Sequence, residues 1–142
     1  MTTYCTVIDS PKEPKEVFEY MATFSNARDW DPSVVEAEAL TPGQANLGSQ
    51  FRLGVRVAGR VTWFDYTVVA IDRPKRVVLR AESGLVASTD TIEVEPLGSG
   101  TRMRYYAVLD PRGPLRLAGP LVGRSFGKMA DRAAAGLRGA LA

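Results

Sequence analysis

The sequence predicts one α+β domain, in which a curved antiparallel sheet of about six or seven strands wraps on a long C-terminal helix. The first observation is a change of hydrophobic period, from helical spacing before residue 30 to strict alternation after residue 34. The second is a run of alternating segments separated by short turn sequences, which is typical of hairpin-connected strands. The third is a long amphipathic stripe at the end of the chain, which can cover the apolar face of such a sheet.

The N-terminal part predicts one strand followed by one or two short helices. Residues 4–8 are rich in β-branched and aromatic side chains, which favours a strand that ends at the following Asp-Ser-Pro sequence. Pro14 suits the first turn of a helix, because its missing N–H needs no partner there. Apolar residues then recur at steps of three and four and form one helical face. Residues 26–32 predict a polar turn or a second short helix.

The middle of the chain predicts a succession of strands. Apolar and polar residues alternate along six segments, which indicates strands with one buried face. Short turn sequences separate the segments, among them residues 58–59 and the Gly98–Ser99–Gly100 hairpin. The six segments are 35–39, 51–57, 60–71, 77–82, 90–95 and 102–109.

The segment after Pro114 predicts the long helix. Gly119, Pro120 and Gly123 weaken its first turns, so we expect a kink or a late start. Its apolar face consists of Val122, Phe126, Met129, Ala130, Ala133, Leu137 and Leu141. A curved sheet held against one helix often leaves a gap between the two, and such a gap can hold a ligand.

The composition excludes several function classes. The chain has 142 residues, a formal net charge of +2 and no histidine, which excludes Ser–His–Asp and Cys–His catalysis and imidazole metal ligands. The length suits a single domain over residues 1–142, and 45% hydrophobic with 24% charged residues is ordinary for a globular protein. We expect neither a metal nor another cofactor. The mild, mixed charge argues against a nucleic-acid partner.

The sequence also predicts a cytoplasmic location. The lone Cys5 has no partner for an intramolecular disulfide, so nothing indicates an oxidising compartment. The first residues lack the basic and then apolar pattern of a secretory signal. No apolar run is long enough to cross a bilayer as a helix, so we expect no transmembrane segment.

Several short motifs, in order along nearly the whole chain, carry a resemblance to a known family. They are Val17–Phe18–Glu19–Tyr20–Met21, Trp30–Asp31–Pro32–Ser33–Val34, Ile71–Asp72–Arg73–Pro74, Gly100–Thr101–Arg102 and Gly113–Pro114–Leu115. With them, the chain resembles the polyketide cyclase/dehydrase-like branch of the START-like (SRPBCC) superfamily, which has the helix-grip fold. Its members include aromatic polyketide cyclases, lipid and hormone binders and quinone-binding accessory proteins. No catalytic signature carries over residue by residue, because cyclase sites that rely on histidine have no counterpart here.

On a helix-grip fold, the inward-facing side chains are the candidates for a ligand cavity. They either fill a closed core or line an apolar pocket, and periodicity does not decide between the two. The candidate ligand-binding residues are Trp30, Phe51, Leu53, Val55, Tyr66, Val68, Leu79, Ile92, Met103, Tyr105, Phe126 and Met129.

Asp90 is the sharpest candidate for chemistry. It shares its strand face with Ile92 and Val94, which places a carboxylate on the inward face. In an apolar pocket its pKa would rise, as a general acid or base requires. The alternative is that Asp90 reaches solvent or a turn N–H at the start of its strand. Tyr66 and Tyr105 are the candidates to donate a hydrogen bond to a ligand carbonyl or enolate, or are core tyrosines.

Two tryptophans and a basic stripe suggest further contacts. Trp30 is either a lid over the pocket mouth or a plug that packs the short helix on the sheet. Trp63 is expected to face outward, at a homodimer contact or a pocket edge. Arg124, Lys128 and Arg132 recur at four-residue steps on the last helix, which is either a solvated face or a surface for an acidic partner.

Three functions remain open at this point. The first is binding of a small hydrophobic or aromatic ligand between the sheet and the C-terminal helix. The second is a polyketide-type cyclase, aromatase or dehydratase that uses Asp90, Tyr66 and Tyr105, since a site that holds a flexible chain in a reactive shape needs few catalytic groups. The third is a non-catalytic protein-interaction module.

Overall fold

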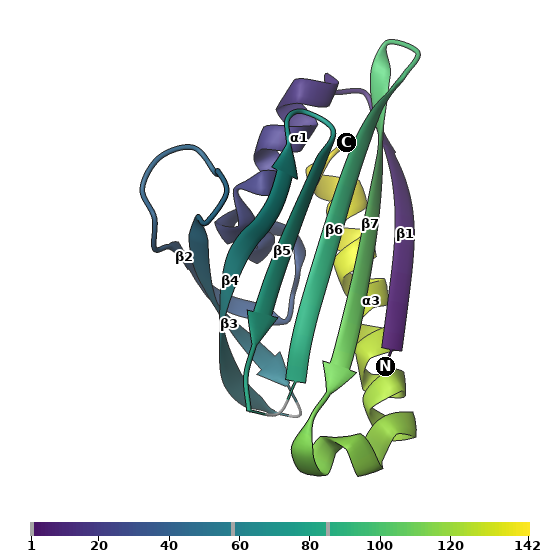
Figure 1. The fold of residues 1–142 in the computed structure, drawn as a ribbon. Helices are drawn as coiled ribbons and strands as arrows, with labels where there is room; N and C mark the ends of the chain where they lie inside the picture. Colours follow the sequence, from purple (N-terminus) through teal and green to yellow (C-terminus); the bar gives the residue numbers. More distant parts are fainter. Residues whose placement is uncertain (1, 58, 85) are drawn as a thin grey trace.

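In the computed structural model, one curled antiparallel sheet surrounds a long C-terminal helix (Figure 1). The structure describes residues 2–57, 59–84 and 86–142, except for the side chains of residues 118–120 and 122. The expected turn at residues 58–59 and the side chain of Val122 therefore fall wholly or partly outside the described residues. The elements are β1 (Thr2–Ser10), α1 (Pro14–Ala22), the 3₁₀ turn η1 (Phe24–Asn26), α2 (Ala27–Trp30), β2 (Val34–Ala39), β3 (Gln50–Val57), β4 (Arg60–Asp72), β5 (Arg76–Glu82), β6 (Val86–Leu97), β7 (Gly100–Pro111), the 3₁₀ turn η2 (Gly113–Ala118) and α3 (Gly119–Ala140).

The sheet has seven strands in the order β1-β7-β6-β5-β4-β3-β2, and every neighbouring pair is antiparallel. From β2 to β7 each strand pairs with the next one along the chain, as short hairpin connections require. β1 pairs with β7 over its whole length, so the first and last strands of the chain lie side by side at one edge of the sheet. The expected α+β helix-grip architecture is confirmed, with seven strands and short helices after the first strand.

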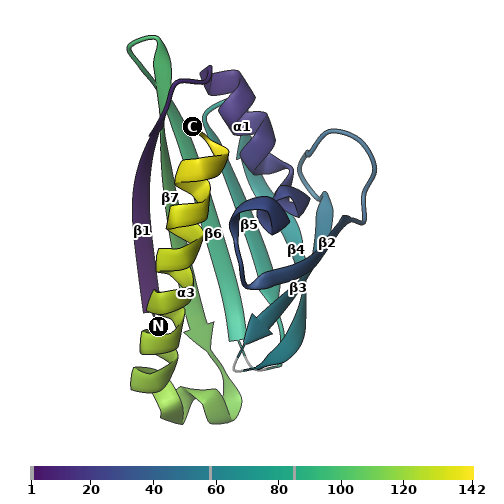
Figure 2. The ribbon, with the colours of Figure 1, turned by 180° about the vertical axis from the view of Figure 1, so that it is seen from behind.

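The helices lie on the concave side of the sheet, where α3 runs along β1 and β7 and the short helices lie beside it (Figure 2). Two hydrogen bonds tie α3 to β1. The Tyr4 hydroxyl donates to the Asp131 carboxylate over 3.0 Å, and the buried Ser10 hydroxyl donates to the Leu141 carbonyl over 2.5 Å. These contacts hold the long helix against the edge of the sheet to which β1 belongs.

The helix α3 begins at Gly119, after the 3₁₀ turn η2, so the α-helix starts later than Pro114, and Gly119, Pro120 and Gly123 lie in its first turns. Pro120 is its second residue, and in the first turn a missing backbone N–H leaves no hydrogen bond unmade. Only the second half of α3 is deeply buried. Ala134 and Leu137, and Leu141 just after the helix, are at most 2% exposed, whereas Phe126, Met129 and Ala130 are half-buried and Leu121 is 70% exposed.

One end of the sheet is closed by a dense core. Val17, Phe18 and Met21 of α1 are fully buried there, which confirms the helical face expected from their spacing. They belong to the same cluster as strand residues from β5 to β7 and as the last turns of α3. At the other end α3 faces the sheet without α1 beside it, so the cover is thinner there (Figure 2).

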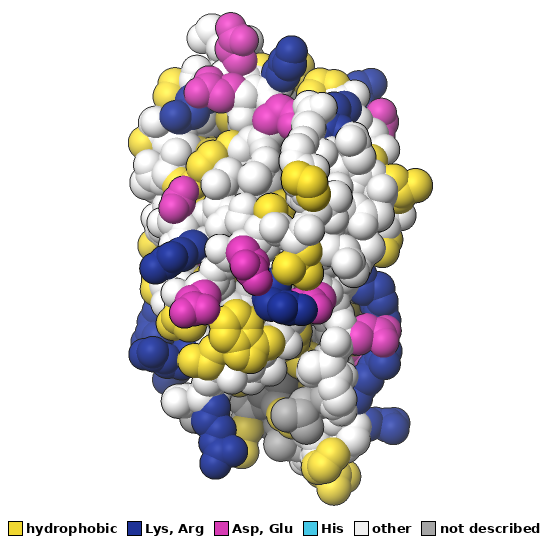
Figure 3. All heavy atoms as spheres, turned by 90° about the vertical axis from the view of Figure 1, so that its left-hand side faces the viewer, with side chains coloured by type: hydrophobic (Ala, Val, Ile, Leu, Met, Phe, Trp, Pro, Cys, Tyr) yellow, Lys and Arg dark blue, Asp and Glu magenta, His cyan; other side chains and the backbone are white. Residues whose placement is uncertain are grey.

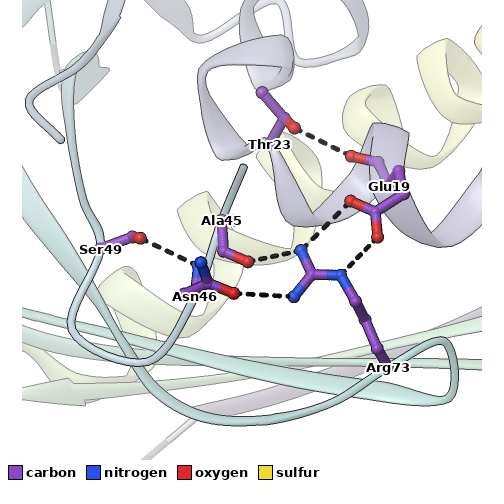
Figure 4. Close-up of polar contacts among 6 residues, drawn as sticks. All are labelled: Glu19, Thr23, Ala45, Asn46, Ser49 and Arg73. Atoms are coloured by element: carbon purple, nitrogen blue, oxygen red, sulfur yellow. Dashed lines mark hydrogen bonds and ion pairs between the residues drawn. The ribbon is translucent and has the colours of Figure 1, made fainter. Parts of the chain in front are cut away.

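Arg73, in the turn between β4 and β5, joins α1 to the loop after β2 (Figure 4). Its guanidinium makes two hydrogen bonds to the Glu19 carboxylate, over 2.5 and 3.2 Å, and others to the Ala45 carbonyl and the Asn46 side chain. It also lies over the Phe18 ring, 5.7 Å from the ring centre. The adjacent guanidinium lowers the pKa of Glu19. This charge-assisted network fixes α1 on the closed end of the sheet.

The two helices α2 and α3 approach each other closely at Gly136. A Cβ atom at this position would lie 2.8 Å from the carbonyl carbon of Trp30 and 3.1 Å from its Cα. Both atoms belong to the backbone of α2, so no side-chain rotation can relieve the contact. The glycine therefore sets how near Trp30 comes to α3.

We expect Gly136→Ala to destabilise the protein, because the new methyl group must push α2 away from α3. The cost of overpacking is about 1–3 kcal/mol, which outweighs the gain of about 1 kcal/mol that alanine brings to a helix. Urea unfolding measures the difference. Gly127→Ala is the matched control, since it lies in the same helix with open space around its Cβ position, and it should stabilise. If both variants change stability in the same direction, the close approach of the helices is not as described.

Candidate functional site

A cavity of about 400 Å³ lies between the concave face of the sheet and the face of α3 from Leu121 to Leu137. All strands except β5 contribute to its floor, α2 forms one side, and Phe126, Met129 and Ala133 of α3 form part of the roof. Most of the lining is apolar. Leu121, which is 70% exposed, also lines it, so the cavity opens beside the start of α3. A volume of this size suits a small organic molecule.

The residues expected to bind a ligand divide into two groups. The cavity is lined by Trp30, Leu53, Val55, Tyr66, Tyr105, Phe126 and Met129. The others face inward but lie outside the lining, in the packed core; they are Phe51, Val68, Leu79, Ile92 and Met103, each at most 2% exposed. The alternation along each strand indicates the face on which a residue lies. The alternation does not indicate where along the sheet the covering helices are in contact with the strands and where they leave a cavity.

Aromatic rings build one wall of the cavity. Trp30 is 5% exposed and packs edge-on against Tyr105, with ring centres 5.6 Å apart. Phe24 packs in the same way against Tyr66, at 4.8 Å. Trp30 also contacts Phe24 at 6.4 Å, so the rings form one continuous cluster. Such edge-to-face pairs hold the rings in fixed orientations. Trp30 is therefore a packed part of the wall and not a lid.

A buried polar cluster lies within this apolar lining. Asp90 on β6 is only 6% exposed, so its carboxylate does not reach solvent at the strand end. The Ser88 hydroxyl donates to Asp90 Oδ1 over 2.9 Å, and the Tyr105 hydroxyl donates to Asp90 Oδ2. Ser88 and Asp90 are two residues apart on one strand and share a face, while Tyr105 reaches Asp90 from the neighbouring strand β7.

Burial changes the proton affinity of these groups. It raises the pKa of Asp90 to about 6, although the hydrogen bonds from Tyr105 and Ser88 oppose the shift. The pKa values of Tyr66 and Tyr105 rise well above the usual range, first because both hydroxyls are buried and second because Asp90 is close. At neutral pH the cluster therefore holds an ionised aspartate and two neutral tyrosines.

Among the polar lining residues that the periodicity missed are Asp31, Ser33 and Ser88. Ser88 could have been found, because it shares the strand face of Asp90. Asp31 follows α2, where no alternation applies, and its Oδ1 accepts bonds from the Ser33 N–H at 2.9 Å and hydroxyl at 2.7 Å. Burial raises the pKa of Asp31, whose charge in turn raises the pKa of Asp90. The two carboxyls therefore belong to one electrostatic site.

A second hollow lies on the outer face over β2 to β4, where acidic and basic side chains surround hydrophobic ones (Figure 3). Trp63, 51% exposed, faces outward as expected and lies over Gly54, where a Cβ would come within 3.0 Å of its ring. Arg52 and Asp65 beside it are already paired, at 2.8 Å. This hollow is open and largely charged, so we place the candidate site in the inner cavity.

Two further features bear on partners. Arg124, Lys128 and Arg132 are all exposed on α3. Their role toward an acidic partner, like a homodimer contact at Trp63, stays a prediction. Within the described residues, no helix is long and apolar enough to span a membrane, and no three acidic or thiol side chains gather closely enough to hold a metal ion.

The family described as polyketide cyclase/dehydrase and lipid transport matches residues 1–142. The chain belongs to this family. A search of the curated proteins finds no match to the chain. The family covers both enzymes and carriers, so membership supports a ligand-binding or cyclase role and leaves the specific function open.

Solved structures of the START superfamily share the fold. A START superfamily protein from Mycobacterium smegmatis has a TM-score of 0.80 at 17% identity, covering 99% of this chain and 97% of its own. An aromatase/cyclase from Streptomyces sp. R1128 has a TM-score of 0.78 at 16% identity, covering 98% and 92%. The major latex-like protein 151 of Panax ginseng has 0.68 at 10% identity, covering 98% and 96%. At these identities the likeness shows the fold alone.

The buried Asp90 predicts a pH-dependent stability. Its folded-state pKa of about 6 lies above the ordinary 3.8, so the folded protein binds the proton more tightly than the unfolded chain does. Stability is therefore lost as the pH rises from about 4 through 6, by up to about 3 kcal/mol. Asp90→Asn removes this term. In urea unfolding between pH 4 and 7.5, the free energy of unfolding of the variant, relative to that of the unmodified protein, should increase as the pH rises. A difference that stays constant or shrinks with rising pH would contradict the assignment.

Proposed function

We propose that the protein binds a small hydrophobic or aromatic molecule in the cavity under α3. The observation that carries the proposal is an apolar cavity of about 400 Å³ whose only described charged lining groups are Asp31 and Asp90. A closed protein interior is packed to the density of a crystal, with few voids larger than a water molecule. A space of this size, lined by fixed aromatic rings, is therefore suited to a guest molecule. The family's description, which includes lipid transport, supports the proposal.

Filling the cavity from its roof tests ligand binding. Ala133 lines the cavity, whereas Ala135 is exposed on the same helix. We expect Ala133→Phe to weaken binding of the uncharged fluorescent probe N-phenyl-1-naphthylamine at least about tenfold, because the new ring occupies the probe's space. Ala135→Phe, the matched control, should leave the affinity within about twofold. Equal effects of the two variants, or no probe binding by the unmodified protein, would count against the cavity as the binding site.

A second candidate function is catalysis of a cyclase, aromatase or dehydratase type. The specific observation that favours it is the pKa of Asp90, about 6, beside two buried tyrosine hydroxyls. In such a reaction the carboxylate takes the proton from the carbon next to a ketone, and a tyrosine hydroxyl donates a hydrogen bond to the enolate oxygen that forms. Tyr105 donates its one proton to Asp90 in the structure, so the donor to the enolate is Tyr66, or Tyr105 once it turns away from Asp90. The aromatase/cyclase of similar fold supports this candidate without assigning residues.

Proton exchange on a simple ketone tests the catalytic candidate without knowledge of the natural substrate. With 2-tetralone in D₂O, the protein should accelerate exchange at the carbon next to the carbonyl, as followed by NMR. Asp90→Asn should lose about 100-fold of the acceleration, since a positioned base contributes a factor of that order. Tyr105→Phe should lose less, because Tyr66 remains. If the unmodified protein gives no acceleration, or if Asp90→Asn keeps it within a few-fold, Asp90 is not the base.

A non-catalytic interaction module is the remaining alternative. The exposed Trp63 ring packs on Gly54 of its own sheet. Its exposure alone is therefore not evidence for a partner protein. The cytoplasmic location also stays a prediction. We therefore place ligand binding first and catalysis second.

A further inference from the structure

The cavity is unusual in the sign of its charge. Its charged lining residues are Asp31 and Asp90, and no Lys or Arg lines it among the residues that the structure describes. The residues or side chains that are not described are Met, Leu, Ala, Gly, Pro and Val, so none of them is a Lys or an Arg. The protein has 18 Lys and Arg residues, yet it keeps all of those described outside this space.

The described residues fill only half of the hydrogen-bond acceptor positions of the buried Asp90 carboxylate. Each carboxylate oxygen can accept about two hydrogen bonds. Asp90 receives one at each oxygen, from Ser88 and Tyr105, and neither donor carries a charge. Of its described contacts, none is an ion pair. An ionised carboxylate in an apolar space without a counter-charge is costly, and a donor on a bound molecule would reduce that cost.

We infer that the cavity selects its ligand by charge: it takes an apolar or aromatic molecule that presents a hydroxyl or a protonated amine to Asp90, and it rejects carboxylates. The inference rests on the proposed ligand binding and adds the ligand's polar group to it. A hydroxyl or an ammonium donates to the free acceptor positions of Asp90. The ammonium in addition supplies the counter-charge that the protein lacks. A carboxylate offers no donor and meets two like charges, Asp90 and Asp31.

The inference separates two ligand classes of equal shape. Fatty acids and aromatic acids would need a basic side chain in the lining, which is absent from its described residues. Phenols, alcohols and amines need an acceptor, which Asp90 supplies. The apolar walls bind the body of all these molecules alike, so any difference among them reports on the polar cluster alone.

Three naphthalene derivatives that differ only in the polar group test the inference. They are 2-naphthylmethanol, 2-naphthylmethylamine and 2-naphthoate, each titrated calorimetrically at pH 7.5. The amine and the alcohol should bind at least about tenfold more tightly than the carboxylate. In Asp90→Asn the amine should lose about tenfold, while the alcohol changes by less than about threefold, because the amide oxygen still accepts its hydrogen bond. Asp110→Asn, at an exposed position of β7, removes the same charge outside the cavity and is the matched control.

The outcomes distinguish a failure of the charge selection from a failure of the proposed ligand binding. If the carboxylate binds as tightly as the amine, the charge selection is wrong and ligand binding stands. If none of the three binds, the proposed function itself fails, and the inference with it. Should Asp90→Asn not fold, the ranking of the three compounds on the unmodified protein decides alone. An equal loss of amine affinity in Asp110→Asn and Asp90→Asn would also overturn the inference, since the effect would then be long-range.

Discussion

The structure depends on one constraint: the concave face of a seven-stranded sheet is wider than one helix can cover. The Arg73–Glu19 network fixes α1 on one end of this face, and the second half of α3 packs beside it. Gly136 and the hydrogen bond from Ser10 set how closely α3 approaches its neighbours. Away from α1, the face of α3 from Leu121 to Leu137 spans the sheet without filling the space beneath it. The cavity is what remains, so it results from the same contacts that stabilise the fold.

The chemistry of the site follows from that geometry. An aspartate on an exposed strand face would be an ordinary carboxylate, but beneath α3 its pKa rises to about 6. Ser88 and Tyr105 keep it hydrogen-bonded without neutralising it. Binding and catalysis would both use this one group, either as the acceptor for a ligand or as the base for a substrate. The two functions therefore share a site and differ in what occupies it.

Much of the fold could be predicted from the sequence, because hydrophobic alternation directly reports which face of each strand is buried. The same alternation placed Asp90 on the inward face. It could not separate Leu53, in the cavity wall, from Phe51 two residues earlier in the core, since both share one face. That difference depends on where the helices touch the sheet, which is a long-range property. Asp31 was missed for a related reason: it lies after a short helix, and tertiary packing alone brings it to the cavity.

A crystal structure of the protein with 2-naphthylmethanol is the most direct test of these conclusions. We expect the naphthalene ring between the sheet and the first half of α3, against Trp30 and Phe126, with the hydroxyl within about 3.2 Å of the Asp90 carboxylate. The side chains of the closed core should not move. A ring bound in the outer hollow near Trp63, or an α3 that collapses onto the sheet and fills the space with its own side chains, would contradict them.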